Sequence, residues 1–225
     1  MNNEGINEII NINNQFYEAN NDSFDNSRSY GYWEGFDEIL RFIPLEPEIL
    51  DLGCGNGRFL RYLLDKNVAI QSYLGLDTSK DFLRKDVEKY PNFEFKELDV
   101  ISYLETINQK FSLITAFGLT HHIPNYQFRK KWFEKIEKLV ASQGILALSF
   151  WEFDTSKNDS NFIPEKYLIE ENDFFLGWKD NFTTHRYCHL FKNEEILEII
   201  SNFKNLELLN MVKKDQNTYL ILRAK

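Results

Sequence analysis

The chain is poor in cysteine and proline, and its acidic residues outnumber its basic ones. Its 225 residues include two cysteines, five prolines, 26 Lys and Arg, and 35 Asp and Glu, for a net charge of -9. Cys54 and Cys188 do not have the spacing of a disulfide framework or a metal-ligand pattern, so we predict a reduced protein without a metal site. The acidic balance argues against a broad nucleic-acid surface, because neutralising phosphates requires clustered Lys and Arg.

Long hydrophobic runs and Pro/Gly/Ser-rich linkers are also absent. No window approaches the roughly 18 apolar residues of a membrane span, and the opening MNNEGINEII lacks the basic start and apolar core of a signal peptide. We therefore expect a soluble, cytoplasmic protein with no membrane partner. The hydrophobic share of 43% is enough for a full core, and the length suits a single domain over residues 1–225.

Short apolar runs alternate with helical periodicities from about residue 48 onward. Runs typical of buried parallel strands are EILDLG (48–53), SYLGLD (72–77), FEFKELDV (93–100), FSLITAFG (111–118) and GILALSFW (144–151). A terminal antiparallel hairpin follows a helix that we expect Asn193 to cap. The order predicts a Rossmann-like, doubly wound α/β fold with a mostly parallel seven-stranded sheet.

This pattern divides the chain into four parts. We expect a helical amino-terminal lid at 1–46, a cofactor-binding core at 47–151, a substrate-side insertion at 152–190, and a final helix and hairpin at 191–225. The insertion is too long for a simple connection in a compact domain, which favours a functional role. The helix that begins near Pro124 is amphipathic, and we expect its basic residues to face outward: Arg129, Lys130, Lys131, Lys135 and Lys138.

A glycine-rich corner lies between the first strand and the helix after it. Residues 53–57 read Gly-Cys-Gly-Asn-Gly, and such a turn presents backbone N–H groups and a helix N-terminus to a ligand. Arg58 stands where a dinucleotide fingerprint would place its last glycine, and the G-K-[ST] of a P-loop is missing. Asp51, before the turn, would repel a pyrophosphate, which favours a ligand with a cationic group.

Two further carboxylates follow the next strands. Asp77, which Thr78 follows, has the spacing at which a carboxylate accepts hydrogen bonds from ribose hydroxyls, and Asp99 with Val100 can receive and cover an adenine. Acids at the carboxyl ends of three successive strands mark the place where ligands of open α/β sheets bind. The pattern therefore predicts a nucleoside-like cofactor.

These motifs resemble those of class I S-adenosylmethionine-dependent methyltransferases. The resemblance rests on LDLGCGNG, GLD, LDV and ITAFGLTHHI and covers roughly residues 45–150. It implies S-adenosylmethionine as the cofactor. It assigns the methionine end to Asp51, Gly53, Cys54, Gly55, Asn56 and Gly57, the ribose to Asp77 beside Thr78, the adenine to Asp99 and Val100, and the floor of the site to Ala116 and Phe117.

The amino-terminal stretch FYEANNDSFDNSRSYGYWEGFDEIL resembles a narrower group, the methyltransferases that esterify a carboxymethyl group on the wobble uridine of tRNA. Arg28 matches that group's arginine and is placed with the cofactor site, and THHI (120–123) and RYCHLF (186–191) resemble its later blocks. The resemblance implies a tRNA partner and a small activating subunit. The acidic stretch from Asp154 to Asp180 departs from that group, whose tRNA face is more basic.

The acceptor chemistry stays open between two arrangements. A carboxylate acceptor needs a cation to hold it, for which Arg186 is the candidate and Arg28 the alternative. An amine or phenol acceptor would need a base, for which the candidates are His121, His122 and His189. Residues that can stack on a planar substrate are Tyr32, Trp151, Trp178 and Tyr187.

We therefore predict an enzyme that transfers a methyl group to a carboxylate or similar acceptor, with a modified tRNA wobble uridine as the candidate substrate. The main alternative is an O- or N-methyltransferase of small metabolites, which fits the acidic charge better. A third reading is a non-catalytic, cofactor-binding scaffold, because fold and function can separate.

Overall fold

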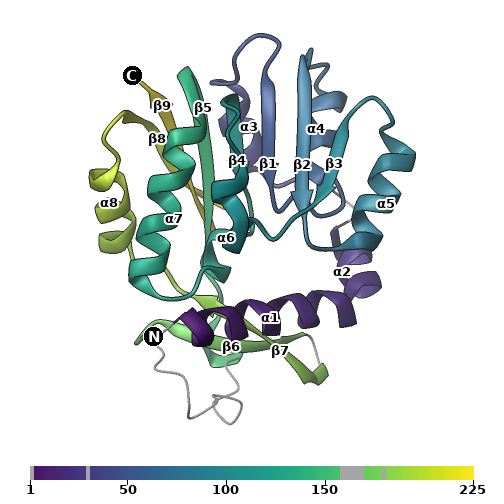
Figure 1. The fold of residues 1–225 in the computed structure, drawn as a ribbon, viewed down its shortest axis with the longest axis vertical. Coiled ribbons are helices and arrows are strands. Elements are labelled where there is room, and N and C mark those ends of the chain that lie inside the picture. The colour runs from purple at the N-terminus through teal and green to yellow at the C-terminus, as the bar shows by residue number, and fades with distance from the viewer. Residues whose placement is uncertain (1–2, 29–30, 158–169, 179–180) are drawn as a thin grey trace.

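A seven-stranded sheet organises the computed structural model, which describes residues 3–28, 31–157, 170–178 and 181–225 (Figure 1). The strand order is β3-β2-β1-β4-β5-β9-β8, with β9 antiparallel to β5 and β8. The strands are β1 (Glu48–Leu52), β2 (Ser72–Asp77), β3 (Glu94–Glu97), β4 (Phe111–Ala116), β5 (Val140–Trp151), β8 (Leu206–Lys214) and β9 (Asn217–Ala224). The predicted doubly wound fold is confirmed.

Helices cover both faces of the sheet (Figure 1). Alternate residues of β1 face opposite sides, with Leu50 and Leu52 in one hydrophobic cluster and Ile49 in the other. The helices that contribute to the first cluster are α1 (Asn3–Ala19), α6 (Val100–Tyr103), α7 (Tyr126–Leu139) and α8 (Asn193–Asn202), and those of the second are α3 (Gly35–Leu40) and α4 (Arg58–Asp65). The helix α5 (Lys80–Lys89) packs beside β3. Burial on both sides explains why the strands are continuous apolar runs.

A second layer lies across the carboxyl ends of the parallel strands. The long helix α1 (Asn3–Ala19) runs beneath them, and a two-stranded antiparallel sheet of β6 (Asp173–Trp178) and β7 (Asn181–His189) packs against it (Figure 1). The sequence predicted α1 but no strands within residues 152–190. The gap between this layer and the sheet is where the predicted cofactor residues lie.

Several local predictions are wrong. The amino-terminal lid expected at 1–46 includes a second helix, α2 (Asn21–Arg28). The N-cap of α8 is Lys192 and not Asn193. Arg129 of α7 is buried, not solvent-facing. No helix in the described part of the chain is long and apolar enough to cross a membrane.

Candidate active site

The glycine turn connects β1 to α4 in a backbone conformation that side chains disfavour. Gly53, Gly55 and Gly57 have φ values of 71°, 55° and 65°, in the left-handed region that glycine adopts without a steric cost. A Cβ on Gly55 would meet nothing within 4 Å, whereas a Cβ on Gly57 would lie 3.1 Å from Asp86 Oδ1. The turn is therefore open on the cavity side and tightly packed against α5 on the other.

Asp77, at the end of β2, holds this turn in place. Its Oδ2 accepts a hydrogen bond from Gly55 N at 2.9 Å, and its Oδ1 accepts one from Ser79 N at 2.9 Å. Burial raises the pKa of Asp77 despite these backbone hydrogen bonds. Because an ionised carboxylate has about four acceptor positions, Asp77 can still accept hydrogen bonds from a ligand's hydroxyl groups.

Asp51 lies at the cavity end of β1 in a buried, polar setting. Tyr73 and Thr115 each donate a hydroxyl hydrogen bond of 2.7 Å to its carboxylate. Burial outweighs these bonds and raises the pKa of Asp51 to about 6. Burial and the charge of Asp77 raise the pKa of nearby Asp86 to about 8. This concentration of buried acids favours a ligand that brings positive charge.

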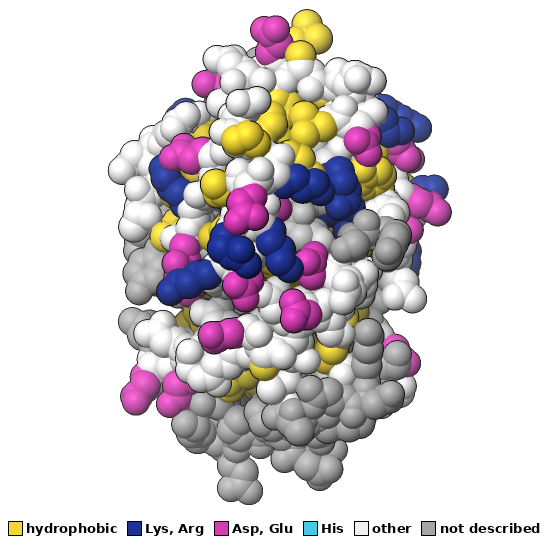
Figure 2. Space-filling view, turned by 90° about the vertical axis from the view of Figure 1, so that its right-hand side faces the viewer, with side chains coloured by type: hydrophobic (Ala, Val, Ile, Leu, Met, Phe, Trp, Pro, Cys, Tyr) yellow, Lys and Arg dark blue, Asp and Glu magenta, His cyan; other side chains and the backbone are white. Residues whose placement is uncertain are grey.

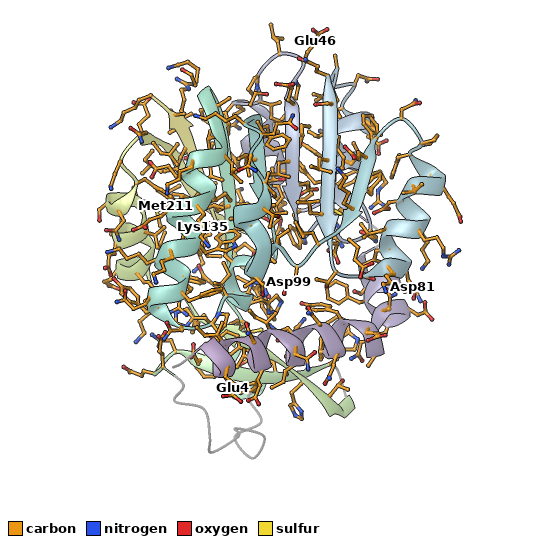
Figure 3. The ribbon with its side chains drawn as sticks, in the orientation of Figure 1. Glu4, Glu46, Asp81, Asp99, Lys135 and Met211 are labelled. Carbon is orange, nitrogen blue, oxygen red and sulfur yellow. The ribbon has the colours of Figure 1, made fainter. Side chains whose placement is uncertain are left out.

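Asp99 connects β3 to α6. Its Oδ1 accepts a hydrogen bond from Ile101 N at 3.0 Å, which makes it the N-cap of α6, and its Oδ2 accepts one from Ser102 Oγ at 2.9 Å. Val100 is the first residue of that helix and not the end of a strand. Figure 3 shows Asp99 between the carboxyl ends of the strands and α1.

These residues line one cavity of about 400 Å³ between the sheet and the α1 layer, a size typical of small-molecule sites. The cavity combines most of the predicted cofactor residues with part of the predicted acceptor residues. The predicted residues that line it are Asp51, Gly53, Cys54, Gly55, Asn56, Asp77, Thr78, Asp99, Val100, Phe117, His121, His122, Trp151 and Arg186. Gly57 and Ala116 support it without lining it, and the side chain of Arg28 lies outside the described residues.

Arg186 of β7 is the cation at the acceptor end of the cavity, and only 6% of its surface is exposed. Its guanidinium lies 5.0 Å from the ring of Trp151, 5.1 Å from Phe16 and 5.4 Å from Trp178. Within the described chain it makes one hydrogen bond, of 3.5 Å, from Nη1 to Tyr17 Oη, and no carboxylate pairs with it. A buried cation without an anion is costly to the fold, which points to a ligand that supplies the anion.

His122 lies beside Arg186 as a neutral imidazole. Burial and the charge of Arg186 lower the pKa of His122 to about 3. Its Nδ1 lies 2.8 Å from the carbonyl oxygen of Tyr187, so Nδ1 carries the proton, and Nε2 accepts a 2.6 Å hydrogen bond from Tyr17 Oη. A histidine held neutral in this way can orient Tyr17 but is a weak base at neutral pH.

Four predicted acceptor residues do not line the cavity. His189 lies behind β7, where Nδ1 bonds Asp173 at 2.6 Å and Nε2 bonds Glu195 at 2.8 Å. Tyr187 points to the opposite face from Arg186 and donates to Asp173. The hydroxyl of Tyr32 bonds Asp65 outside the cavity. Trp178 contacts Arg186 without lining the cavity, so it positions the guanidinium. We therefore remove His189, Tyr187 and Tyr32 from the acceptor site.

Several residues that line the cavity were not predicted from the sequence. Asn13, Asn14 and Tyr17 of α1 and Phe24 of α2 close it from below. Asp215 and Gln216 of the β8–β9 turn and Asn217, the first residue of β9, also line it. The aromatic stretch that includes Tyr17 and Phe24 was the signal that could have indicated these residues. Aromatic residues along one face of an amphipathic helix suggest that another part of the protein packs over that face.

Comparisons with known proteins agree with this geometry. A family model described as a methyltransferase domain matches residues 50–146. A protein of Encephalitozoon cuniculi that carries a methyltransferase name is 25% identical over 196 residues, covering 86% of this chain and 87% of its own. Residues 50–146 of this chain form a methyltransferase domain.

Solved methyltransferases share its fold. An S-adenosylmethionine-dependent methyltransferase of Clostridium acetobutylicum has a TM-score of 0.64 at 17% identity, with 92% of this chain and 98% of that chain covered. A Burkholderia thailandensis N1-methyltransferase with bound 1,6-didemethyltoxoflavin and S-adenosylhomocysteine has a TM-score of 0.71 at 14% identity, with 98% and 90% covered. At these identities the likeness concerns the fold.

Solved structures of the same fold hold S-adenosylmethionine or its product, and together with the methyltransferase domain and the predicted motifs they support S-adenosylmethionine as the cofactor. The cavity fits it, because the glycine turn is open toward the cavity at Gly55 and the strand-end acids lie along one wall. Asp51 and the turn would hold the methionine end, Asp77 the ribose, and Asp99 with Val100 the adenine. An enzyme, and not a non-catalytic scaffold, is the reading that the comparisons support.

Proposed function

We propose that this methyltransferase methylates a small molecule that bears a carboxylate, and that Arg186 holds that carboxylate. The observation that carries the proposal is the buried Arg186 guanidinium, which faces the cofactor cavity and has no carboxylate partner in the described chain. Arg is well suited to this role, because its planar guanidinium binds both oxygens of a carboxylate.

The chemistry needs no general base, which fits a site whose histidine is held neutral. When bound, S-adenosylmethionine supplies an electrophilic methyl carbon, and its transfer to a carboxylate oxygen forms a C–O bond while the C–S electron pair returns to sulfur. Arg186 and Trp151 would hold the acceptor, and alignment of this kind supplies much of the rate enhancement. No proton is released when a carboxylate is esterified.

A small acceptor fits the surroundings of the cavity better than tRNA does. The α1 layer and the β6–β7 sheet cover the acceptor end (Figure 1). On the face drawn in Figure 2, Lys and Arg are interleaved with Asp and Glu. Exposed ion pairs of α5 and β3 include Lys80–Glu97, Arg84–Glu88 and Lys96–Glu94. Paired charges attract phosphate weakly. The tRNA acceptor and the activating subunit stay predictions from the resemblance.

A named relative also supports an acidic acceptor. The trans-aconitate 2-methyltransferase of Agrobacterium fabrum is 25% identical over 148 residues, which cover 65% of this chain and 53% of that protein. Its name specifies a small polycarboxylic acid. Trans-aconitate is therefore a suitable first probe.

Transfer of tritium from methyl-labelled S-adenosylmethionine tests the proposal. The acceptors to compare are trans-aconitate, the acidic fraction of a metabolite extract, and bulk tRNA. We expect label in acidic small molecules, released by mild alkali as from a methyl ester, and loss of transfer in Arg186→Met but not in Arg84→Met, a change of the exposed Arg84 on α5. Label only in tRNA, or only in alkali-stable products, would contradict the proposal.

A further inference from the structure

We infer that Asn13 of α1 is a second carboxylate-binding residue, which forms with Arg186 a two-sided receptor for the acceptor. The inference rests on the proposed function and adds the residue that determines specificity. The two residues come from segments that are far apart in the sequence. Asn13 lies on α1, and Arg186 lies on β7, the strand that packs against α1.

The amide of Asn13 is fixed with its donor end unused. Asn13 Oδ1 accepts a 2.7 Å hydrogen bond from the backbone N–H of Tyr187. A backbone N–H can only donate, so this bond fixes which end of the amide is oxygen. The Nδ2 group is buried without a hydrogen-bond partner, the side chain is 4% exposed, and Asn13 lines the cavity. Buried donors without partners are rare in folded proteins, and a ligand oxygen would satisfy this one.

Arg186 presents a matching unused donor. Arg186 Nε is also buried without a hydrogen-bond partner, and Arg186, like Asn13, lines the cavity. The two residues are neighbours in space, because Asn13 binds the backbone of Tyr187, the residue next to Arg186. The rings of Phe16, Trp151 and Trp178 hold the guanidinium from the sides, which leaves its polar edge for a ligand.

This receptor selects by charge and by shape. Both unpaired groups are donors, so they match the two acceptor oxygens of a carboxylate. A neutral carboxamide of the same shape would place its own N–H₂ donors against one of them and leave buried donors unpaired. We therefore expect Asn13 and Arg186 together to distinguish carboxylates from their amides.

A side-chain NMR titration tests the inference on the whole chain. The probe is benzoate, a planar carboxylate whose ring matches the aromatic wall, with benzamide as its neutral isostere, in the presence of S-adenosylhomocysteine and at constant ionic strength. We expect the Asn13 Nδ2 and Arg186 Nε signals to shift with one shared saturation curve on addition of benzoate, and not with benzamide.

The three outcomes separate the two proposals. Shifts at both groups support the inference. A shift at Arg186 alone overturns the role of Asn13 and leaves the proposed function standing. No shift at either group overturns the receptor and removes the observation on which the proposed function rests.

A charge variant supplies an independent check. Asn13→Asp keeps the oxygen that accepts from Tyr187 but replaces the free donor with an anion, and we expect benzoate affinity to fall by about tenfold or more, because like charges repel in a buried site. Asn11→Asp makes the same change on the exposed side of α1 and should leave the affinity unchanged. S-adenosylhomocysteine affinity should be unchanged in Asn11→Asp, because Asn11 does not line the cavity. Wild-type benzoate affinity in Asn13→Asp would overturn the inference.

Discussion

Replacing Arg186 with methionine should abolish activity and stabilise the fold at the same time. The guanidinium is buried without an anion, so the variant no longer incurs a desolvation penalty of several kcal/mol. It loses three ring contacts worth up to ~2 kcal/mol each, and the methionine sulfur restores ~0.3–1.5 kcal/mol for each ring it contacts. We expect the relieved desolvation penalty to exceed the ring contacts that methionine does not restore, with a net gain of about 1 to 3 kcal/mol, as is typical when buried charged groups are replaced by apolar side chains.

Thermal unfolding in the absence of ligand measures this effect. Each kcal/mol corresponds to roughly 2 to 4 °C in Tm for a chain of this size, so Tm should rise by several degrees. Arg129→Met is the matched control. Arg129 is equally buried, but Glu170 at 2.6 Å and Glu195 at 3.2 Å pair with it. Its loss strands two partly buried carboxylates and should cost about 3 to 5 kcal/mol.

The opposite pattern would refute the reasoning. If Arg186→Met lowers Tm as much as Arg129→Met does, Arg186 is a structural residue and its burial says nothing of an acceptor. Methyl transfer should be measured on the same two variants. A variant that is inactive because it is unstable has a lower Tm, whereas a variant that has lost only an acceptor-binding residue does not.

Three further predictions concern the acids of the cofactor site and the cluster behind β7. Asp77→Asn should weaken S-adenosylhomocysteine binding by about 1 to 3 kcal/mol, and unchanged affinity by calorimetry would contradict the ribose assignment. Burial raises the pKa of Asp51 to about 6, so affinity for the cationic cofactor should increase as the pH rises through about 6 and Asp51 ionises. Calorimetry between about pH 5 and 8 measures this increase. In Asp51→Asn the cofactor affinity should not depend on pH over this range. Burial lowers the pKa of His189, but the hydrogen bonds to Asp173 and Glu195 outweigh this effect, so the pKa is raised. Wild type should therefore be more stable than His189→Gln by its full margin below about pH 6.5, and this margin should disappear as the pH rises through the pKa of His189 in the folded protein. Denaturant unfolding at a series of pH values measures the margin.

The cofactor half of the site could be predicted because its signals are local. In the stretch from Ile49 to Leu60, an apolar run, a glycine turn and an amphipathic helix follow one another directly, and the structure has the same order. Asp77 follows from the same logic one strand later. Strand ends and glycine turns depend on neighbours in the sequence, so the sequence alone can specify them.

The acceptor half could not be predicted in this way, because its signals are long-range. Strand β7 contains NFTTHRYCH, where buried Arg186 and His189 interrupt the alternation typical of a strand. The burial of Arg186 depends on α1, which lies far away in the sequence, and the burial of His189 depends on Asp173 and Glu195, which are 16 and 6 residues away on β6 and α8. The burial of Arg129 could not be predicted from the sequence for the same reason. Asn13 lies in an asparagine-rich stretch, where its sequence does not distinguish it from exposed neighbours such as Asn11.

A crystal structure with S-adenosylhomocysteine and a methylated acidic product would test the central claim most directly. The account predicts the product's carboxyl-derived oxygens within hydrogen-bonding distance of Arg186, beside Trp151 and facing the sulfur of the cofactor product. A product bound with its carboxyl group away from Arg186, or outside the cavity beneath α1, would contradict it.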